Sequence, residues 1–109
     1  MSDLPQEYLE GIDLFNRGKF FEAHEVWESI WMHSQGDLRL FYQALIQAAA
    51  ALLHRQNGNR TGAENLFAAS TDKFSRVSPQ VLGLDVRGFC RRLLDPRSVP
   101  RIVLSFPKK

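Results

Sequence analysis

The feature that most constrains the fold is the segment 37–55, in which apolar residues surround almost the whole helical wheel. Phe41, Leu45 and Leu52 recur at spacings that place them on one helical face. A run of four alanines at 48–51 extends the apolar surface around the sides and lets neighbouring backbones approach closely. Because a helix that is apolar on nearly every side is buried on every side, the sequence predicts a central helix here.

Further helices are predicted before and after this central one. Each shows apolar residues at the helical period and is bounded by a glycine, asparagine, aspartate or proline signal. No segment is predicted to form a sheet. Beyond Asp95 the prolines exclude a long helix, so residues 102–106 are expected to form an extended tail against the helices. The further predicted helices cover residues 4–17, residues 19–33, a segment from Asn59 or Thr61 to about Val77, and residues 85–94.

The chain is therefore predicted to be all-α, as a compact bundle of about five helices. Two antiparallel helical hairpins, a C-terminal helix and an extended tail from about residue 95 make up this bundle. A faint repeat supports the two hairpins, because Gly18 and Ala23 recur 40 residues later as Gly58 and Ala63. The length of 109 residues suits a single helical domain over residues 1–109 with one core.

Composition and charge exclude several classes of protein. No apolar run reaches the roughly 20 residues of a membrane span. The first ten residues lack the pattern of a secretory signal, so we expect a cytoplasmic protein with no membrane partner. The single cysteine, Cys90, allows neither an internal disulfide nor a multi-cysteine zinc site. The net charge of +2 comes mainly from the C-terminal part without a nucleic-acid motif, so nucleic acid is not the expected partner. The sequence is also compatible with a homo-oligomer.

A group of ionisable residues lies at the edge of the apolar face of the helix predicted at 19–33. On a wheel of about 100° per residue, Glu28 lies about 40° from His24, and Glu25 lies about 100° from it. His24 and Glu28 sit one turn apart, so their side chains can touch. Placing carboxylates and an imidazole in partly apolar surroundings costs free energy unless they pair with each other, with another helix or with a ligand.

Three interpretations of this group stay open. It can be a buried ion pair that orients two helices, with Arg39 as a third member. It can hold a metal through His24, Glu28 and His54, although neither the HExxH nor the di-iron Glu-x-x-His pattern is present. It can also be a metal-free acid–base site in which His24 acts with Glu25 or Glu28.

The central helix carries a narrow polar stripe of its own, formed by Gln43, Gln47 and His54. This stripe is either the solvated face of the helix or one wall of a polar cleft that faces the preceding helix. In the second case Trp27 and Trp31 would form an aromatic wall, whereas tryptophans one turn apart are otherwise plain core. A short connection makes the two helices antiparallel neighbours and so favours the cleft. The candidate cleft residues are His24, Glu25, Glu28, Trp31, Arg39, Gln43, Gln47 and His54.

The motif FNRGKFFEAHEVWE at 15–28, the motif FYQALIQ at 41–47 and the following Gly-Asn and Gly-Ala pairs resemble the DUF309 family of uncharacterised proteins. The resemblance covers about residues 8–75 and implies a small all-helical domain with no established activity. Ala44 departs from the family pattern, which favours glycine there, and this lessens the expectation of a very close backbone approach. The family's signature polar positions fall on His24, Glu25, Glu28, Arg39, Gln43, Gln47, His54 and Asn59.

The function expected from these observations is a binding or interaction module. Its polar cleft would hold a small anionic or polar ligand, or a peptide from a partner protein. The alternative is a small hydrolase or lyase that uses His24 with Glu25 or Glu28, with or without a metal. The residues themselves assign no cofactor.

Overall fold

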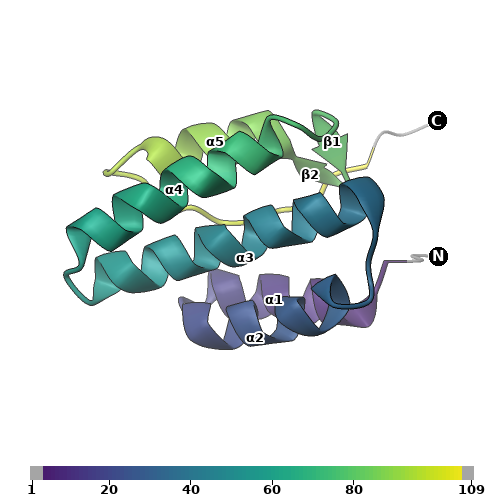
Figure 1. Ribbon diagram of the computed structural model, residues 1–109, viewed down its shortest axis with the longest axis horizontal. Coiled ribbons are helices and arrows are strands. Elements are labelled where there is room, and N and C mark those ends of the chain that lie inside the picture. The colour runs from purple at the N-terminus through teal and green to yellow at the C-terminus, as the bar shows by residue number, and fades with distance from the viewer. Residues whose placement is uncertain (1–3, 107–109) are drawn as a thin grey trace.

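The computed structural model describes residues 4–106 and contains five helices and one short hairpin in that range (Figure 1). The predicted all-α bundle is confirmed, and every helix lies within three residues of its predicted bounds. In chain order the elements are α1 (Gln6–Asn16), α2 (Phe20–Trp31), α3 (Gly36–Gln56), α4 (Arg60–Phe74), β1 (Gln80–Val81), β2 (Leu84–Asp85) and α5 (Val86–Leu94).

Helix α3 lies in the middle of the molecule, with α1 and α2 on one side and α4 and α5 on the other (Figure 1). Leu45, Ala48 and Ala49 are fully buried, and the small alanines let the flanking helices pack closely. The prediction of a central helix is therefore confirmed. In the described range no helix, α3 included, is both long and apolar enough to cross a membrane.

The two helical hairpins, α1–α2 and α3–α4, share the same turn. Gly18 and Gly58 occupy equivalent places, with φ angles of 78° and 77°, which glycine adopts without steric cost. In each turn the glycine N–H donates to the carbonyl three residues back, and the next N–H donates to the carbonyl five residues back. This is the Schellman pattern that ends many helices, so the sequence repeat corresponds to a repeated helix end.

The antiparallel hairpin β1–β2 departs from the expectation that no sheet forms. Val81 pairs with Leu84, and the two residues between them both have positive φ, 49° at Leu82 and 82° at Gly83. A type I′ turn requires this conformation at both positions. Each strand has only two residues, too few to produce a visible alternation in the sequence.

The C-terminal tail runs extended along the bundle, as predicted (Figure 1). The Asn16 side chain fastens it to α1, because Nδ2 donates to the Ile102 carbonyl and Oδ1 accepts from the Ile102 N–H, both at 2.8 Å. Ile102 is buried. Further on, the Ser105 N–H donates to the Gly83 carbonyl at 2.8 Å. The tail therefore connects α1 to the β1–β2 hairpin.

Candidate functional site

A hollow of about 140 Å³ opens between α2 and α3. Four of the residues that line it are among the predicted cleft residues, and the fifth, Ile46, is not. Ile46 is a buried apolar residue of α3. The lining residues are Glu28 and Trp31 from α2 and Gln43, Ile46 and Gln47 from α3.

Three side-chain atoms in this region are shielded from solvent and have no hydrogen-bond partner among residues 4–106. They are Trp31 Nε1, Gln47 Oε1 and His24 Nδ1. Most buried polar groups in proteins are paired, because an unpaired one costs about 1–3 kcal/mol. Trp31 offers a donor and Gln47 an acceptor. Both side chains line the hollow, and each carries one buried polar atom without a partner in the described range.

His24 is partly buried one turn before Glu28. The Nε2 atom of His24 lies 3.8 Å from Glu28 Oε2, which is too long for a hydrogen bond. The His24 ring lies parallel to the Phe21 ring, at 11° and a centroid distance of 6.4 Å. Phe21 is exposed, and the Glu28 side chain is half exposed. The imidazole thus stands between an exposed ring and a solvated carboxylate, not in a buried ion pair.

Arg39 binds the end of α2 instead of a carboxylate. Its guanidinium carbon lies 4.0 Å from the centre of the Trp31 ring. Arg39 Nη1 also donates to the carbonyl oxygens of Trp31, at 3.1 Å, and of Ser34, at 3.3 Å. The last carbonyls of a helix lack donors within it, so Arg39 caps the C-terminus of α2. In the described range Arg39 forms no ion pair and is not the third member of a His24–Glu28 group.

His54 lies away from the hollow, in the last turn of α3. Its Nδ1 accepts a hydrogen bond from Asn59 Nδ2 at 2.8 Å, while Asn59 Oδ1 accepts from the Gly62 N–H at 3.1 Å. Because the amide oxygen of Asn59 is engaged by an N–H donor, its nitrogen faces the histidine. His54 and Asn59 therefore fasten the α3–α4 turn, and the structure does not bring His54 together with the cleft residues.

The positions of the remaining predicted residues give little support to the acid–base and metal hypotheses. Glu25 is exposed and has no hydrogen bond or ion pair within residues 4–106. Among these residues no group of three or more His, Cys, Asp or Glu side chains is arranged to hold a metal ion. The candidate ligands His24, Glu28 and His54 consequently do not form such a group.

Trp27 and Trp31 have different roles, which the helical wheel left open. Trp27 is fully buried, and its Nε1 donates to the Tyr8 carbonyl at 3.2 Å. Trp31 is only partly buried, and its indole N–H is unpaired in the described part of the chain. Trp27 is core, whereas Trp31 forms a wall of the hollow.

Comparison with known families bears on the same region. The family model of DUF309, a domain of unknown function, matches residues 8–66, which is 59 of the 109 residues. The chain belongs to the DUF309 family. The resemblance inferred from the motifs is thus confirmed. No curated protein sequence matches the chain.

The DUF309 match runs from α1 into α4 and ends before the β1–β2 hairpin. It includes every residue that lines the α2–α3 hollow, and also the His54–Asn59 hydrogen bond. Helix α5 and the tail lie outside it. The hollow is therefore a feature of the DUF309 part of the chain.

Proposed function

We propose that this DUF309 protein is a binding module whose α2–α3 hollow holds a small polar group. The observation that carries this proposal is a pair of atoms without a partner among residues 4–106. They are Trp31 Nε1 and Gln47 Oε1, on two side chains that line the same hollow. A bound group that offers one acceptor and one donor, such as a carboxamide, would satisfy both atoms.

The size of the hollow limits what it can hold. Sites for drug-sized ligands measure roughly 300–1,000 Å³, whereas this hollow measures about 140 Å³. A water molecule takes about 30 Å³ of liquid volume, so the space corresponds to a few waters. The ligand we propose is accordingly a molecule of a few non-hydrogen atoms, or the polar end of one side chain from a partner protein.

The charge at the rim narrows the ligand class further. Glu28 lines the hollow and its side chain is half exposed, so a carboxylate stands where a ligand would enter. A like charge next to it would be repelled. This favours an uncharged carboxamide over an anionic ligand.

The immobilisation of Trp31 also favours a binding role. Arg39 stacks on the Trp31 ring and binds its carbonyl oxygen, so both the side chain and the backbone of this wall are held in place. A site whose walls are fixed before binding loses less conformational entropy when the ligand arrives.

The alternative of a hydrolase or lyase has weaker support. The 3.8 Å separation of His24 Nε2 and Glu28 Oε2 leaves the two groups beyond hydrogen-bond length. The second candidate carboxylate, Glu25, points to no partner in the described range. Hydrolysis of a simple aryl ester by the wild-type protein, lost in a folded His24→Ala variant, would favour this alternative.

A titration with propionamide, followed by NMR of the indole N–H resonances, tests the binding proposal. Trp31→Phe identifies the Trp31 resonance, because it removes that indole. We expect a saturable shift of this resonance in the wild type. Gln47→Met should abolish the shift, since it removes the acceptor while keeping a side chain of similar length.

Gln35→Met provides the matched control, because Gln35 is exposed and does not line the hollow. This variant should bind propionamide as the wild type does. The proposal is wrong if propionamide gives no saturable shift, or if Gln47→Met responds like the control.

A further inference from the structure

A second and wider depression lies where α3 turns into α4 and where α5 ends, at the opposite end of the molecule from the β1–β2 hairpin (Figure 1). Two adjoining hollows, of about 310 and 350 Å³, share Arg55, Glu64 and Phe67 as lining residues. They therefore form one continuous surface depression, which we call the α4–α5 groove. None of its lining residues belongs to the α2–α3 hollow.

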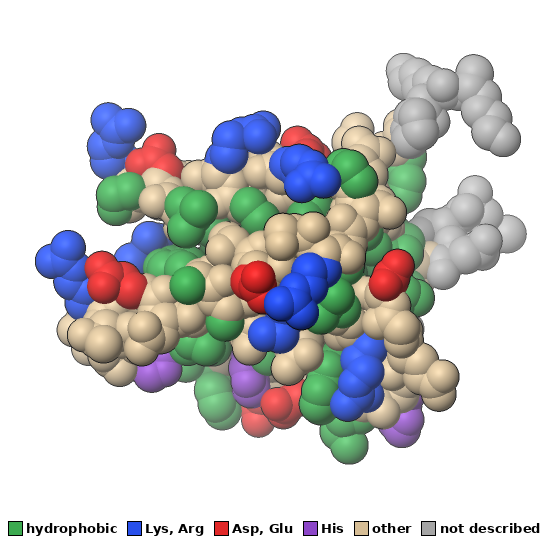
Figure 2. All heavy atoms as spheres, turned by 45° about the horizontal axis from the view of Figure 1, so that its top comes forward, with side chains coloured by type: hydrophobic (Ala, Val, Ile, Leu, Met, Phe, Trp, Pro, Cys, Tyr) green, Lys and Arg blue, Asp and Glu red, His purple; other side chains and the backbone are tan. Residues whose placement is uncertain are grey.

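The walls of the α4–α5 groove are largely apolar. Phe67 comes from α4, Leu93 and Leu94 come from the end of α5, and Pro96 follows them. Leu94 is 59% exposed although it is a large aliphatic residue. Figure 2 shows hydrophobic side chains open to solvent at this end of the molecule, between groups of charged side chains. The groove thus offers apolar surface that the described chain leaves uncovered.

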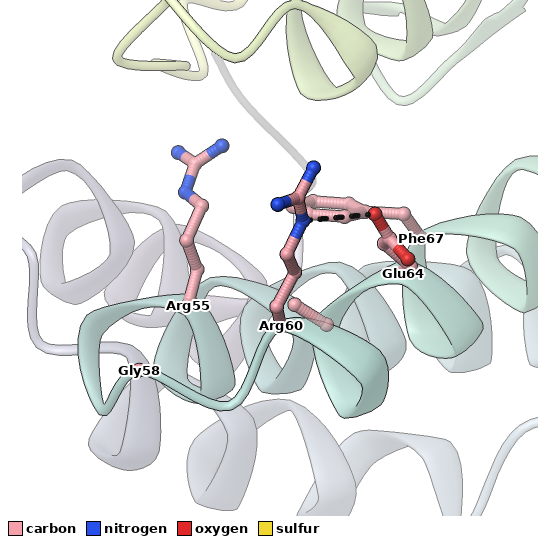
Figure 3. Close-up of a pocket in the computed structure, with 6 residues that line it drawn as sticks. Arg55, Gly58, Arg60, Glu64 and Phe67 are labelled. Carbon is pink, nitrogen blue, oxygen red and sulfur yellow. Dashed lines mark hydrogen bonds and ion pairs between the residues drawn. The ribbon is translucent and has the colours of Figure 1, made fainter.

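One end of the groove is positively charged. The Arg55 guanidinium carbon lies 5.6 Å from the centre of the Phe67 ring. Arg55 is exposed and forms no ion pair among residues 4–106. Arg60 has Glu64 as its partner at 3.4 Å, with both side chains mostly exposed. In Figure 3 the Arg55 and Arg60 side chains extend from α3 and α4 on the same side of the ribbon, toward α5.

The charges at this end do not cancel. Among the described lining residues, two guanidinium groups stand beside a single carboxylate. An exposed ion pair such as Arg60–Glu64 contributes little to stability. Arginine presents donors in a planar fork that matches a carboxylate. An acidic side chain of a binding partner would therefore complement the excess positive charge at this end of the groove.

We propose that the α4–α5 groove binds an acidic and apolar peptide segment of a partner protein. An Asp or Glu of the segment pairs with Arg55, and a neighbouring large apolar side chain packs between Phe67 and Leu94. The burial of apolar surface provides affinity, and the carboxylate provides orientation. This interaction surface is separate from the α2–α3 hollow, so it does not depend on the function proposed for that hollow.

Selection of peptides from a random dodecapeptide display library on the immobilised wild-type protein tests the proposal. We expect the selected peptides to carry Asp or Glu close to Leu, Ile, Met, Phe or Trp. A synthetic peptide of the best sequence is then titrated with each protein variant. Because a hydrogen bond to a charged group is lost, Arg55→Ala should weaken binding by at least about tenfold. Leu94→Asp should do the same through charge repulsion and lost apolar contact.

Matched controls come from exposed residues elsewhere. Among residues 4–106 the Arg17 side chain forms only an exposed pair with Asp13, and Val103 is an exposed apolar residue of the tail. Arg17→Ala and Val103→Asp should bind the peptide like the wild type. All four altered positions are exposed, and thermal unfolding checks that each variant is folded.

Three results would overturn the proposal. The first is a selection without enriched sequences, or with peptides rich in Lys and Arg. The second is a selected peptide that binds Arg55→Ala and Leu94→Asp as tightly as the wild type. The third is the absence of peptide binding together with Arg55-dependent binding of a short single-stranded DNA, which would assign the groove to nucleic acid.

Discussion

The guanidinium carbon of Arg39 lies 4.0 Å from the centre of the Trp31 ring, and Nη1 of the same group donates a hydrogen bond to the Trp31 carbonyl at 3.1 Å. A residue in the first turns of α3 thereby holds both the ring and the backbone of the last residue of α2. Since Trp31 is a wall of the α2–α3 hollow, the helix cap and the shape of the candidate site depend on one side chain.

Arg39→Lys tests this dependence. Lysine keeps the positive charge but has neither the planar group that stacks on an indole nor the fork of donors. We expect a loss of about 1 kcal/mol in the free energy of unfolding, from one weakened capping interaction and the lost stacking. The Trp31 indole N–H resonance should also shift. Chemical denaturation and NMR measure the two effects.

The control for this substitution is Arg17→Lys, because Arg17 is largely exposed and, within the described part of the chain, pairs only with Asp13. It should change stability by less than about 0.5 kcal/mol. Equal stabilities of the Arg39→Lys and Arg17→Lys variants would show that capping by Arg39 does not contribute to the free energy of unfolding.

Gly11→Ala tests the close contact between α1 and α2. A Cβ atom at Gly11 would overlap the Trp27 indole, whose N–H is bonded to the Tyr8 carbonyl. Fitting an extra methyl group into a packed core costs about 1–3 kcal/mol. Alanine is otherwise the better helix former by about 1 kcal/mol. A net loss of stability in chemical denaturation would show that the overlap outweighs propensity, and a gain would contradict the contact.

The alkaline stability of the protein should depend on Tyr8. Burial raises the pKa of the Tyr8 phenol, with the neighbouring Tyr42 adding to the effect. The folded protein therefore keeps the Tyr8 proton at a pH where the unfolded chain, with a tyrosine pKa of about 10, loses it. Stability linked to Tyr8 is full below about pH 10 and falls as the pH rises above that value.

Denaturation midpoints of the wild type and Tyr8→Phe, measured from neutral pH to beyond pH 10, check this dependence. At neutral pH the variant should lose about 1 kcal/mol, because the Tyr8 hydroxyl bonds the Leu82 carbonyl at 3.2 Å. Above about pH 10 its stability should fall less steeply than that of the wild type. Parallel pH profiles would contradict the pKa shift of Tyr8.

The helices and the core could be predicted because their signals act locally. The period of apolar residues in α3 and the glycines at 18 and 58 determine where a helix can be buried and where it ends. The β1–β2 hairpin escaped prediction, since two-residue strands have no period. The attachment of the tail to Asn16 depends on a contact across 86 residues, for which a single sequence carries no signal.

For the candidate site, the sequence predicted only the angle at which each side chain leaves its helix, and not its position along the helix. A helical wheel gives the angle of a side chain around the axis, and by that measure His54 and Gln47 share one stripe of α3. Seven residues separate them, which is about 10 Å along the helix at about 1.5 Å per residue. His54 is thus carried to the last turn of α3, where Asn59 binds it. The α4–α5 groove was missed because its lining residues come from separate segments of the chain, and nothing in the sequence indicates that these segments meet.

The last prediction compares two buried polar groups in α3 and α4. The Ser70 hydroxyl is fully buried and donates to the Ala44 carbonyl at 2.7 Å. Gln47 Oε1 is equally shielded but has no partner among residues 4–106. Ser70→Ala should cost about 1 kcal/mol of stability, because it removes a hydrogen bond that has formed.

Gln47→Met should instead leave stability unchanged or raise it, because it removes a buried acceptor that has no partner among residues 4–106. A residue that is retained although it costs stability is typical of a binding site, where function opposes stability. Urea denaturation of both variants measures the difference. If Gln47→Met destabilised the protein as much as Ser70→Ala, Gln47 would be part of the structural framework and its amide would not be free for a ligand.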